Sequence, residues 1–139
     1  MILVLDTDVI VAALRSPTGA SAELVRMARR GEITIAASVS LMMEYEAVCM
    51  RDEHRLASNL NASQVAVFLD ALASFVRPVT VHFLWRPQLR DPADELVLEA
   101  AVNAGAQALV SFNLRHFKAA AARFNLRLEP PGLFLRSIR

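Results

Sequence analysis

The chain has 139 residues, of which 55% are hydrophobic, and its 15 basic and 14 acidic side chains leave a formal net charge of +1. This length fits one domain that buries a core unaided, and the single cysteine, Cys49, excludes an internal disulfide and suits a reducing cytoplasm. Its apolar runs are too short, or too interrupted by aspartates, to cross a membrane, and no basic stretch precedes the apolar start as in a signal peptide. We therefore expect one domain over residues 1–139, located in the cytoplasm and not associated with a membrane.

The first half of the chain alternates short apolar runs with segments of helical character. The run Ile2–Leu5 is continuously apolar, which is typical of a buried strand, and it ends at Asp6. Ser38 and Asn61 are residue types that often begin helices, and Gly31 can end one. In chain order the pattern predicts a strand at Ile2–Leu5, a helix at Thr7–Arg15, a turn at Ser16–Gly19, a helix at Ala20–Arg30, a strand at Ile33–Ala36, a helix from Ser38 to about Asp52, and a helix from Asn61 or Ser63 to about Val76.

The second half contains the clearest helix start in the sequence. In the run Asp91-Pro92-Ala93-Asp94, the first residue has N-cap chemistry, proline suits the first helical position, and the last places a carboxylate near the positive end of the helix. The other predicted elements are a strand at Pro78–Val81, a polar loop at Arg86–Arg90, the end of the helix near Gly105, a strand at Ala108–Val110, a helix at Leu114–Ala122 that Asn113 can cap, a strand at Arg127–Leu128 and a terminal helix from Pro131.

Strands and helices alternate along the chain, which predicts an α/β fold: a three-layer α/β/α sandwich around a central, mostly parallel, twisted sheet. In such folds, ligands bind in the crevice outside the carboxyl ends of the strands. Asp6 directly follows the first predicted strand, and Asn113 closely follows the strand Ala108–Val110. Both side chains are therefore expected to face this crevice.

Four aspartates fall in two tight clusters, Asp6 with Asp8 and Asp91 with Asp94. A carboxylate directly after a buried strand is costly unless it is paired or bound to a cation, so a helix cap and a metal ligand explain Asp6 about equally well. Asp8 lies in the first helical turn, where an acidic side chain complements the helix dipole. Asp91 is better explained as a cap before Pro92. Asp94 lies beside the apolar face of its helix, which makes a purely structural explanation weaker.

Several other polar side chains allow more than one interpretation. Glu44 and Glu46 flank the apolar stripe of the same predicted helix, and geometry alone does not choose between them. Glu95 is expected to point elsewhere than its aspartate neighbour, and Glu99 to complete a solvated edge. Asn113 either caps its helix or orients a ligand or a water molecule.

The three histidines, His54, His82 and His116, have no partner at metal-ligand spacing, and a lone histidine in an amphipathic helix is usually structural or solvated. The chain has no HxxxH or CxxC motif, no glycine-rich phosphate loop and no nucleophile elbow. Nothing in the sequence therefore suggests Ser/His/Asp catalysis.

Taken together and in order, these motifs resemble the PIN-domain ribonucleases, especially the toxin-like branch related to VapC. The resemblance extends over nearly the whole chain, and its specificity comes from the order and spacing of the motifs. The segments that carry it are Leu5-Asp6-Thr7-Asp8-Val9, Ser38–Tyr45, Arg90–Glu95 with the helix that follows, Leu109–Phe117 and Glu129–Leu135.

The resemblance implies a metal-dependent endoribonuclease that uses Mg²⁺ or Mn²⁺ to cleave single-stranded or structured RNA. It also implies the toxin component of a type II toxin–antitoxin system, with a homodimeric assembly and a cognate antitoxin protein as partner. It selects Glu44 over Glu46. The implied catalytic residues are Asp6, Glu44, Asp94 and Asn113, of which Asp6, Glu44 and Asp94 hold the metal ion with Asp8 and Asp91 as helpers.

Two positions depart from the family pattern. Asp8 stands where the family usually has Asn, which adds negative charge near the metal, and Asn113 stands where many relatives have a fourth Asp. An amide supplies a carbonyl oxygen but carries no charge, so a second metal ion should bind more weakly. The residues expected to contact the RNA are Thr7, Arg15 and Arg115, with Arg86 and Arg90 as further candidates for its backbone.

Two other functions are compatible with the sequence. The run Val4–Val9 also resembles the opening of haloacid-dehalogenase-type phosphatases, in which Asp6 would be a nucleophile and Asp8 a general acid, although the chain is short for that fold and lacks a convincing downstream lysine. The missing fourth acid and the apolar composition would also suit a catalytically idle PIN-like module that binds RNA or a partner protein. For a dimer, Val9–Leu14 and Ser21–Arg30 are the candidate faces.

Overall fold

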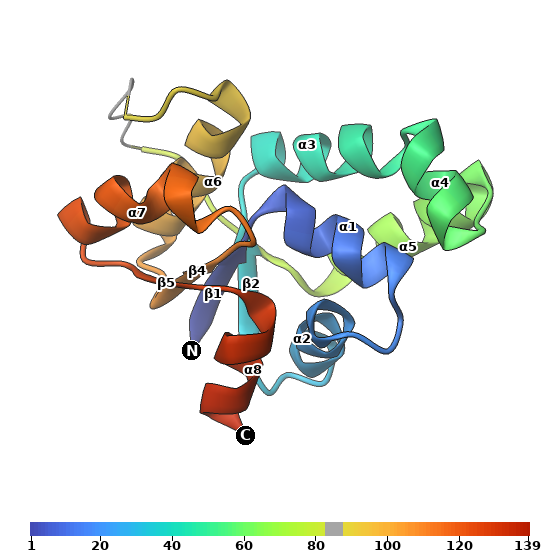
Figure 1. The fold of residues 1–139 in the computed structure, drawn as a ribbon, viewed down its shortest axis with the longest axis horizontal. Helices are drawn as coiled ribbons and strands as arrows, with labels where there is room; N and C mark the ends of the chain where they lie inside the picture. Colours follow the sequence, from blue (N-terminus) through green and yellow to red (C-terminus); the bar gives the residue numbers. More distant parts are fainter. Residues whose placement is uncertain (83–87) are drawn as a thin grey trace.

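A parallel sheet lies at the centre of the molecule in the computed structural model, which describes residues 1–82 and 88–139 (Figure 1). Within these residues the strand order is β3-β2-β1-β4-β5, and every neighbouring pair is parallel. The strands are β1 (Ile2–Leu5), β2 (Thr34–Ala37), β3 (Arg77–Pro78), β4 (Ala108–Val110) and β5 (Arg127–Glu129). The predicted loop Arg86–Arg90 lies partly outside the described residues, and Arg86 lies wholly outside them.

Helices cover both faces of this sheet. Helix α6 packs against β1 and β2 and contacts α7, whereas α2 packs against β2 and contacts α1 and α8. Connections between parallel strands are right-handed, so helices before and after the reversal of strand order lie on opposite faces. The predicted three-layer α/β/α sandwich is therefore confirmed. The described helices are α1 (Thr7–Arg15), α2 (Ala20–Arg29), α3 (Val39–Cys49), α4 (Asp52–Ser58), α5 (Ala62–Phe75), α6 (Pro92–Ala104), α7 (Leu114–Arg123) and α8 (Pro131–Ile138).

The strand order reverses at β1 and β4, because the chain leaves β1 toward β2 but comes back on the other side of β1 as β4. Leu5 lies opposite Val110 in the register of these two strands, and the backbone N–H of Asp6 donates to the carbonyl of Val110 at 2.8 Å. Asp6 and Ser111 are thus the first residues beyond two adjacent strand ends. In parallel α/β sheets, such a reversal opens the crevice in which ligands bind.

One predicted helix is wrong in its extent, the helix from Ser38 to Asp52. It divides into α3, which begins where Ser38 Oγ accepts from the backbone N–H of Leu41 at 3.1 Å, and α4, which begins after Arg51 adopts an extended conformation. No proline or glycine marks the break. Helix α4 also buries none of its residues, so the sequence has no apolar stripe that would predict it as a separate helix.

Helix α5 begins at one of its two predicted starts, whereas strand β3 is shorter than predicted. The side chain of Asn61 accepts from the backbone N–H of Gln64, and the Gln64 side chain accepts from that of Asn61, both at 2.9 Å, so the helix begins after Asn61 rather than Ser63. Strand β3 covers only Arg77–Pro78 instead of the predicted Pro78–Val81. It is an edge strand of the described sheet, where proline is tolerated because no partner needs its missing N–H.

The core lies between the sheet and its helices, and its largest fully buried side chains include Tyr45, Phe117 and Phe134. The candidate dimer face Val9–Leu14 contributes to this core, because all of its residues except Ala12 are buried within the chain. It therefore offers little surface to a second copy. Within the described residues, no helix combines the length and apolar character that crossing a membrane requires.

Candidate active site

Asp6 lies at the carboxyl end of β1 and is only 5% exposed. Its Oδ1 accepts from the backbone N–H of Thr7 at 2.7 Å, and its Oδ2 accepts from the hydroxyl of Ser111 at 2.6 Å. Burial raises the pKa of Asp6, and the two hydrogen bonds only partly oppose this rise. Asp6 is the N-cap of α1 and also lines a pocket, so the same side chain can both cap the helix and belong to the site.

Asp8 does more than complement the dipole of α1, because it also accepts hydrogen bonds from the loop after β4. Its Oδ2 accepts from the backbone N–H of Phe112 at 3.1 Å and from Nδ2 of Asn113 at 3.0 Å, which joins the first turn of α1 to the loop after β4. Its Oδ1 is buried and has no hydrogen-bond partner. Burial, followed by the charge of Asp6, raises the pKa of Asp8 to about 7. An unpartnered carboxylate oxygen beside a second carboxylate is a place where a cation would be stabilising.

Asp94 contributes a third carboxylate from the first turn of α6. It is 8% exposed, and its Oδ2 lies 3.0 Å from Nδ1 of His116 on α7. Burial raises the pKa of Asp94, the charges of Asp6 and Asp91 add to the rise, and His116 opposes it. Carboxylates from β1, α1 and α6 thus influence one another although they are far apart in the sequence.

Glu44 lines the same pocket as these aspartates, whereas Glu46 lines a different pocket, between α3 and α5. The next residue, Tyr45, is fully buried, and its hydroxyl donates to the carbonyl of Leu5 at 2.5 Å, which fixes α3 beside the end of β1. The placement of α3 therefore distinguishes the two glutamates that the sequence pattern left equivalent.

The pocket that collects these acids has a volume of about 780 Å³. It is also lined by the basic side chains of Arg15, Arg51 and His54, and Nη1 of Arg15 lies 3.5 Å from Nδ1 of His54. Thr7 lines it as well, with its Oγ1 buried and unpartnered. Carboxylates that suit a hard cation and guanidinium groups that suit phosphate thus occur in one pocket.

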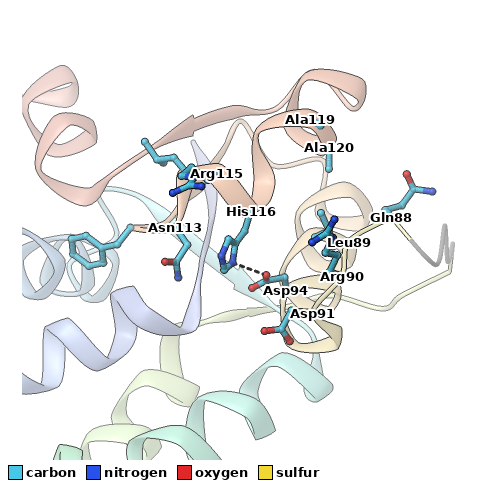
Figure 2. Close-up of a pocket in the computed structure, with 12 residues that line it drawn as sticks. Gln88, Leu89, Arg90, Asp91, Asp94, Asn113, Arg115, His116, Ala119 and Ala120 are labelled. Atoms are coloured by element: carbon cyan, nitrogen blue, oxygen red, sulfur yellow. Dashed lines mark hydrogen bonds and ion pairs between the residues drawn. The ribbon is translucent and has the colours of Figure 1, made fainter.

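A second pocket, of about 800 Å³, adjoins the first. Figure 2 shows Asp94 in contact with His116, and Arg90, Arg115 and Asn113 around them. Arg90 and Arg115 line this second pocket but not the first. The residues that line both pockets are Asp91, Asp94, Phe112 and Asn113. Asp91 and Asp94 therefore lie where two partly basic pockets meet, whereas Asp6, Asp8 and Glu44 line only the first of them.

Asp91 and Asn113, two of the predicted helix caps, behave differently. Asp91 caps α6 as predicted, because its Oδ1 accepts from the backbone N–H of Ala93 at 2.9 Å. Asn113 occupies the N-cap position of α7, but its side chain makes no capping bond, so that part of its prediction is wrong. Its Nδ2 instead donates to Asp8, and its backbone N–H donates to Ser111 Oγ at 2.8 Å. The Asn113 side chain therefore holds a carboxylate rather than a helix end.

The predicted solvated edge at Glu99 is wrong, because Glu99 is only 5% exposed. The physical reason is that α6 contacts β1, β2, β4, α3 and α7, which leaves it no broad face in water. Glu95 is buried as well and lines neither pocket. Its Oε1 accepts from the backbone N–H groups of Gln88 and Leu89 at 2.5 and 2.6 Å, which fixes the segment before α6.

Sequence reasoning missed Ser111 and gave His116 no role. Ser111 is fully buried, donates to Asp6 and is the first residue after β4, as Asp6 is after β1. That equivalence of position was a signal that the sequence contained. The contact of His116 with Asp94 depends on how α6 and α7 pack, so no local pattern could have revealed it.

A family model described as PIN domain matches residues 2–115 of the chain. The chain belongs to the PIN-domain family. The match contains all the predicted catalytic residues, and it favours the PIN interpretation of Asp6 and Asp8 over the phosphatase alternative. No curated protein matches the sequence significantly.

The fold of a PIN domain is supported by one solved relative in particular. A chain in the crystal structure of VapBC2 from Rickettsia felis, bound to a DNA fragment from their promoter, resembles this chain with a TM-score of 0.66. The alignment covers 94% of this chain and 98% of that chain at 20% sequence identity. The structural likeness, rather than the low sequence identity, establishes the shared fold.

PIN domains generally use divalent metal ions, and the donor chemistry of this site fits such an ion. Its carboxylates are hard oxygen donors, one of their oxygens is buried without a partner, and burial raises the pKa of three of them. Within the described residues, however, no three acidic, His or Cys side chains are yet arranged around one point. Ser111 and His116 hold two of these carboxylates in place through their contacts with Asp6 and Asp94.

Proposed function

We propose that this chain is a single PIN domain over residues 1–139 that acts in the cytoplasm as an Mg²⁺- or Mn²⁺-dependent endoribonuclease on single-stranded or structured RNA. The observation that carries the proposal is the meeting of Asp6, Glu44 and Asp94 at one pocket beside the reversal of strand order. A divalent ion bound there would lower the pKa of a bound water and offset charge on the phosphate.

The residues of the chain divide the remaining tasks. Asp6 and Asp94 ligate the ion through their carboxylates, and Glu44 holds the ion or its water. Asn113 positions water or phosphate from the edge shared by the two pockets. Buried carboxylates with raised pKa values favour a cation as partner over solvent. The supporting residues are Asp8 and Asp91 near the ion and Thr7, Arg15 and Arg115 at the RNA.

Cleavage of single-stranded RNA in the presence of Mn²⁺ tests this proposal. We expect chelator to abolish cleavage, and Asp6→Asn and Glu44→Gln each to lower the rate by roughly 100-fold or more, because each removes a charge from the ion site. Glu46→Gln is the matched control, since Glu46 lies two residues from Glu44 on α3 but lines another pocket. Cleavage that persists in chelator, or that falls equally in Glu44→Gln and Glu46→Gln, would contradict the proposed site.

We further propose that the protein is the toxin of a type II toxin–antitoxin system, and that it forms a homodimer and binds an antitoxin protein. The support is the family match together with the fold shared with VapBC2. Induced expression in a bacterium should arrest growth, and Asp6→Asn should not. Growth arrest that is equal for both would show that the effect does not come from this site.

The second candidate is a catalytically idle PIN module that binds RNA or a partner protein. It is favoured by the amide of Asn113 in place of a fourth acid and by the lack, in the described part of the chain, of three ligands gathered around one point. Calorimetry with Mn²⁺, beside the cleavage assay, separates the two. RNA binding without metal binding or cleavage would establish the idle module instead.

A further inference from the structure

Phe112 is the only exposed phenylalanine, tyrosine or tryptophan among residues 1–82 and 88–139, with 53% of its surface in water. The other described aromatic side chains are buried or half-buried. Phe112 lies in the short loop between β4 and α7, and it lines both pockets of the candidate active site. A large apolar ring is therefore kept in water at the point where the two pockets meet.

The backbone that carries this ring is attached to the carboxylates of the site. The N–H of Phe112 donates to Asp8 at 3.1 Å. The residue before it, Ser111, donates to Asp6, and the residue after it, Asn113, donates to Asp8. Three consecutive residues are thus bonded to Asp6 or Asp8, which fixes the base of the ring relative to the acids. A preorganised group of this kind loses little entropy when it binds a ligand.

The charges around Phe112 favour a nucleic acid as the ligand. Arg90 and Arg115 line the pocket on one side of the shared edge, and Arg15 and Arg51 line the other. Guanidinium groups bind phosphates, and exposed aromatic rings between them stack on the bases of single-stranded nucleic acids. A protein partner would instead favour a broad apolar surface. Among the described residues, Leu114 is the only other exposed large apolar side chain that lines either pocket, and the exposed Val39 and Met43 belong to a different pocket.

We propose that Phe112 is a stacking platform for one base of the RNA substrate, next to the phosphate that is cleaved. This inference rests on the proposed ribonuclease function and adds a residue that selects and holds a nucleotide. Stacking tolerates any base, so the platform favours unpaired over paired RNA and contributes to binding more than to the chemical step.

The test uses a short single-stranded RNA that the unmodified protein cleaves, chosen from a randomised pool, and a series of the same RNA with one abasic nucleotide at each position around the cut. In an Asp94→Asn background, Phe112→Ala should weaken RNA binding by roughly 10-fold, as measured by fluorescence anisotropy. With Asp94 intact, Phe112→Ala should raise KM for the RNA more than it lowers kcat. Phe112→Trp should restore binding. Leu133→Ala is the matched control, because Leu133 on α8 is 52% exposed and lines neither pocket.

The decisive result is an RNA with one particular abasic position to which the unmodified protein and Phe112→Ala bind equally well, because the ring then has no base to contact. On the other abasic RNAs, Phe112→Ala should still weaken binding. An effect of equal size on every abasic RNA, or no rescue by Phe112→Trp, would indicate a structural role and overturn the platform. The platform is also overturned if Phe112→Ala leaves RNA binding unchanged and instead disrupts a dimer or a complex with a protein partner. If the unmodified protein neither binds nor cleaves any RNA of the pool, the ribonuclease proposal itself fails, which is a different observation from cleavage that does not depend on Phe112.

Discussion

Individual residues at this site are held in an arrangement that disfavours their own ionisation. Asp6 and Asp8 are separated only by Thr7 in the sequence, and burial raises the pKa of each. Ser111 is one of the few groups that offsets the cost, because its hydroxyl donates directly to Asp6 at 2.6 Å. A neutral hydroxyl that orients a ligand carboxylate acts on metal binding through that carboxylate.

Replacing Ser111 by Ala should therefore affect both stability and metal binding. The loss of a donor to a buried carboxylate is expected to lower the free energy of unfolding by about 1–3 kcal/mol. Loss of the orienting bond should weaken Mn²⁺ binding by about 10-fold or more. Thermal denaturation and calorimetric titration with Mn²⁺ measure the two effects. Ser137→Ala is the control, since that hydroxyl also donates to a protein oxygen, the carbonyl of Phe134 at 2.6 Å, but lies outside both pockets. Mn²⁺ affinity that is the same in both variants would show that Ser111 does not orient a ligand.

At the scale of elements, the position of α3 depends on the buried bond between Tyr45 and Leu5. Tyr45→Phe keeps the packed ring but removes this bond, so it should cost about 1 kcal/mol of stability. Because Tyr45 adjoins Glu44, the same change should lower the Mn²⁺-dependent rate by more than the loss of stability explains. Rates measured well below the midpoint of thermal unfolding separate the two effects. A destabilised variant with a normal rate would mean that α3 holds Glu44 in place without this hydrogen bond.

The elements that the sequence predicts well are those whose signal is local. Strand β1 and helix α1 follow from an apolar run that ends at Asp6, and α6 follows from Asp91 and Pro92. The break between α3 and α4 was missed because no local residue requires it. The burial of Glu99 was missed because it depends on contacts with distant segments, namely the strands and helices that surround α6.

The candidate site shows the same division between local and long-range information. Asp6 was found because a carboxylate directly after a buried strand is costly unless it is paired or bound to a cation, whereas the resemblance to PIN domains selected Glu44 and Asp94. The partners of these carboxylates, Ser111 for Asp6 and His116 for Asp94, arise from the register of β4 with β1 and from the packing of α7 on α6. These contacts join residues that are far apart in the sequence. A single sequence therefore indicates which acidic residues to consider, but not which side chains contact them.

For the whole molecule, the fold brings acids from β1, α1, α3 and α6 to one end of the sheet, and neighbouring like charges favour protonation. The pKa of Asp8 rises from 3.8 to about 7 on folding, so the folded chain binds a proton more tightly than the unfolded chain does. The stability that this proton contributes is fully present below pH 3.8 and is lost as the pH rises through about 7. The pKa values of Asp6 and Asp94 shift in the same direction.

The metal-free protein should therefore be less stable at pH 8 than at pH 6, and Asp8 alone should account for at most about 1.4 kcal/mol of the difference. A divalent ion competes with these protons, so Mn²⁺ should raise the melting temperature more at pH 8 than at pH 6. Asp8→Asn, which cannot titrate, should melt higher than the unmodified chain at pH 8 in chelator and depend less on pH across this interval. Thermal denaturation at both pH values, in chelator and in Mn²⁺, measures all of these differences. Equal stabilisation by Mn²⁺ at both pH values would show that the ion does not compete with protons for these carboxylates, and the proposed metal site would then have to lie elsewhere.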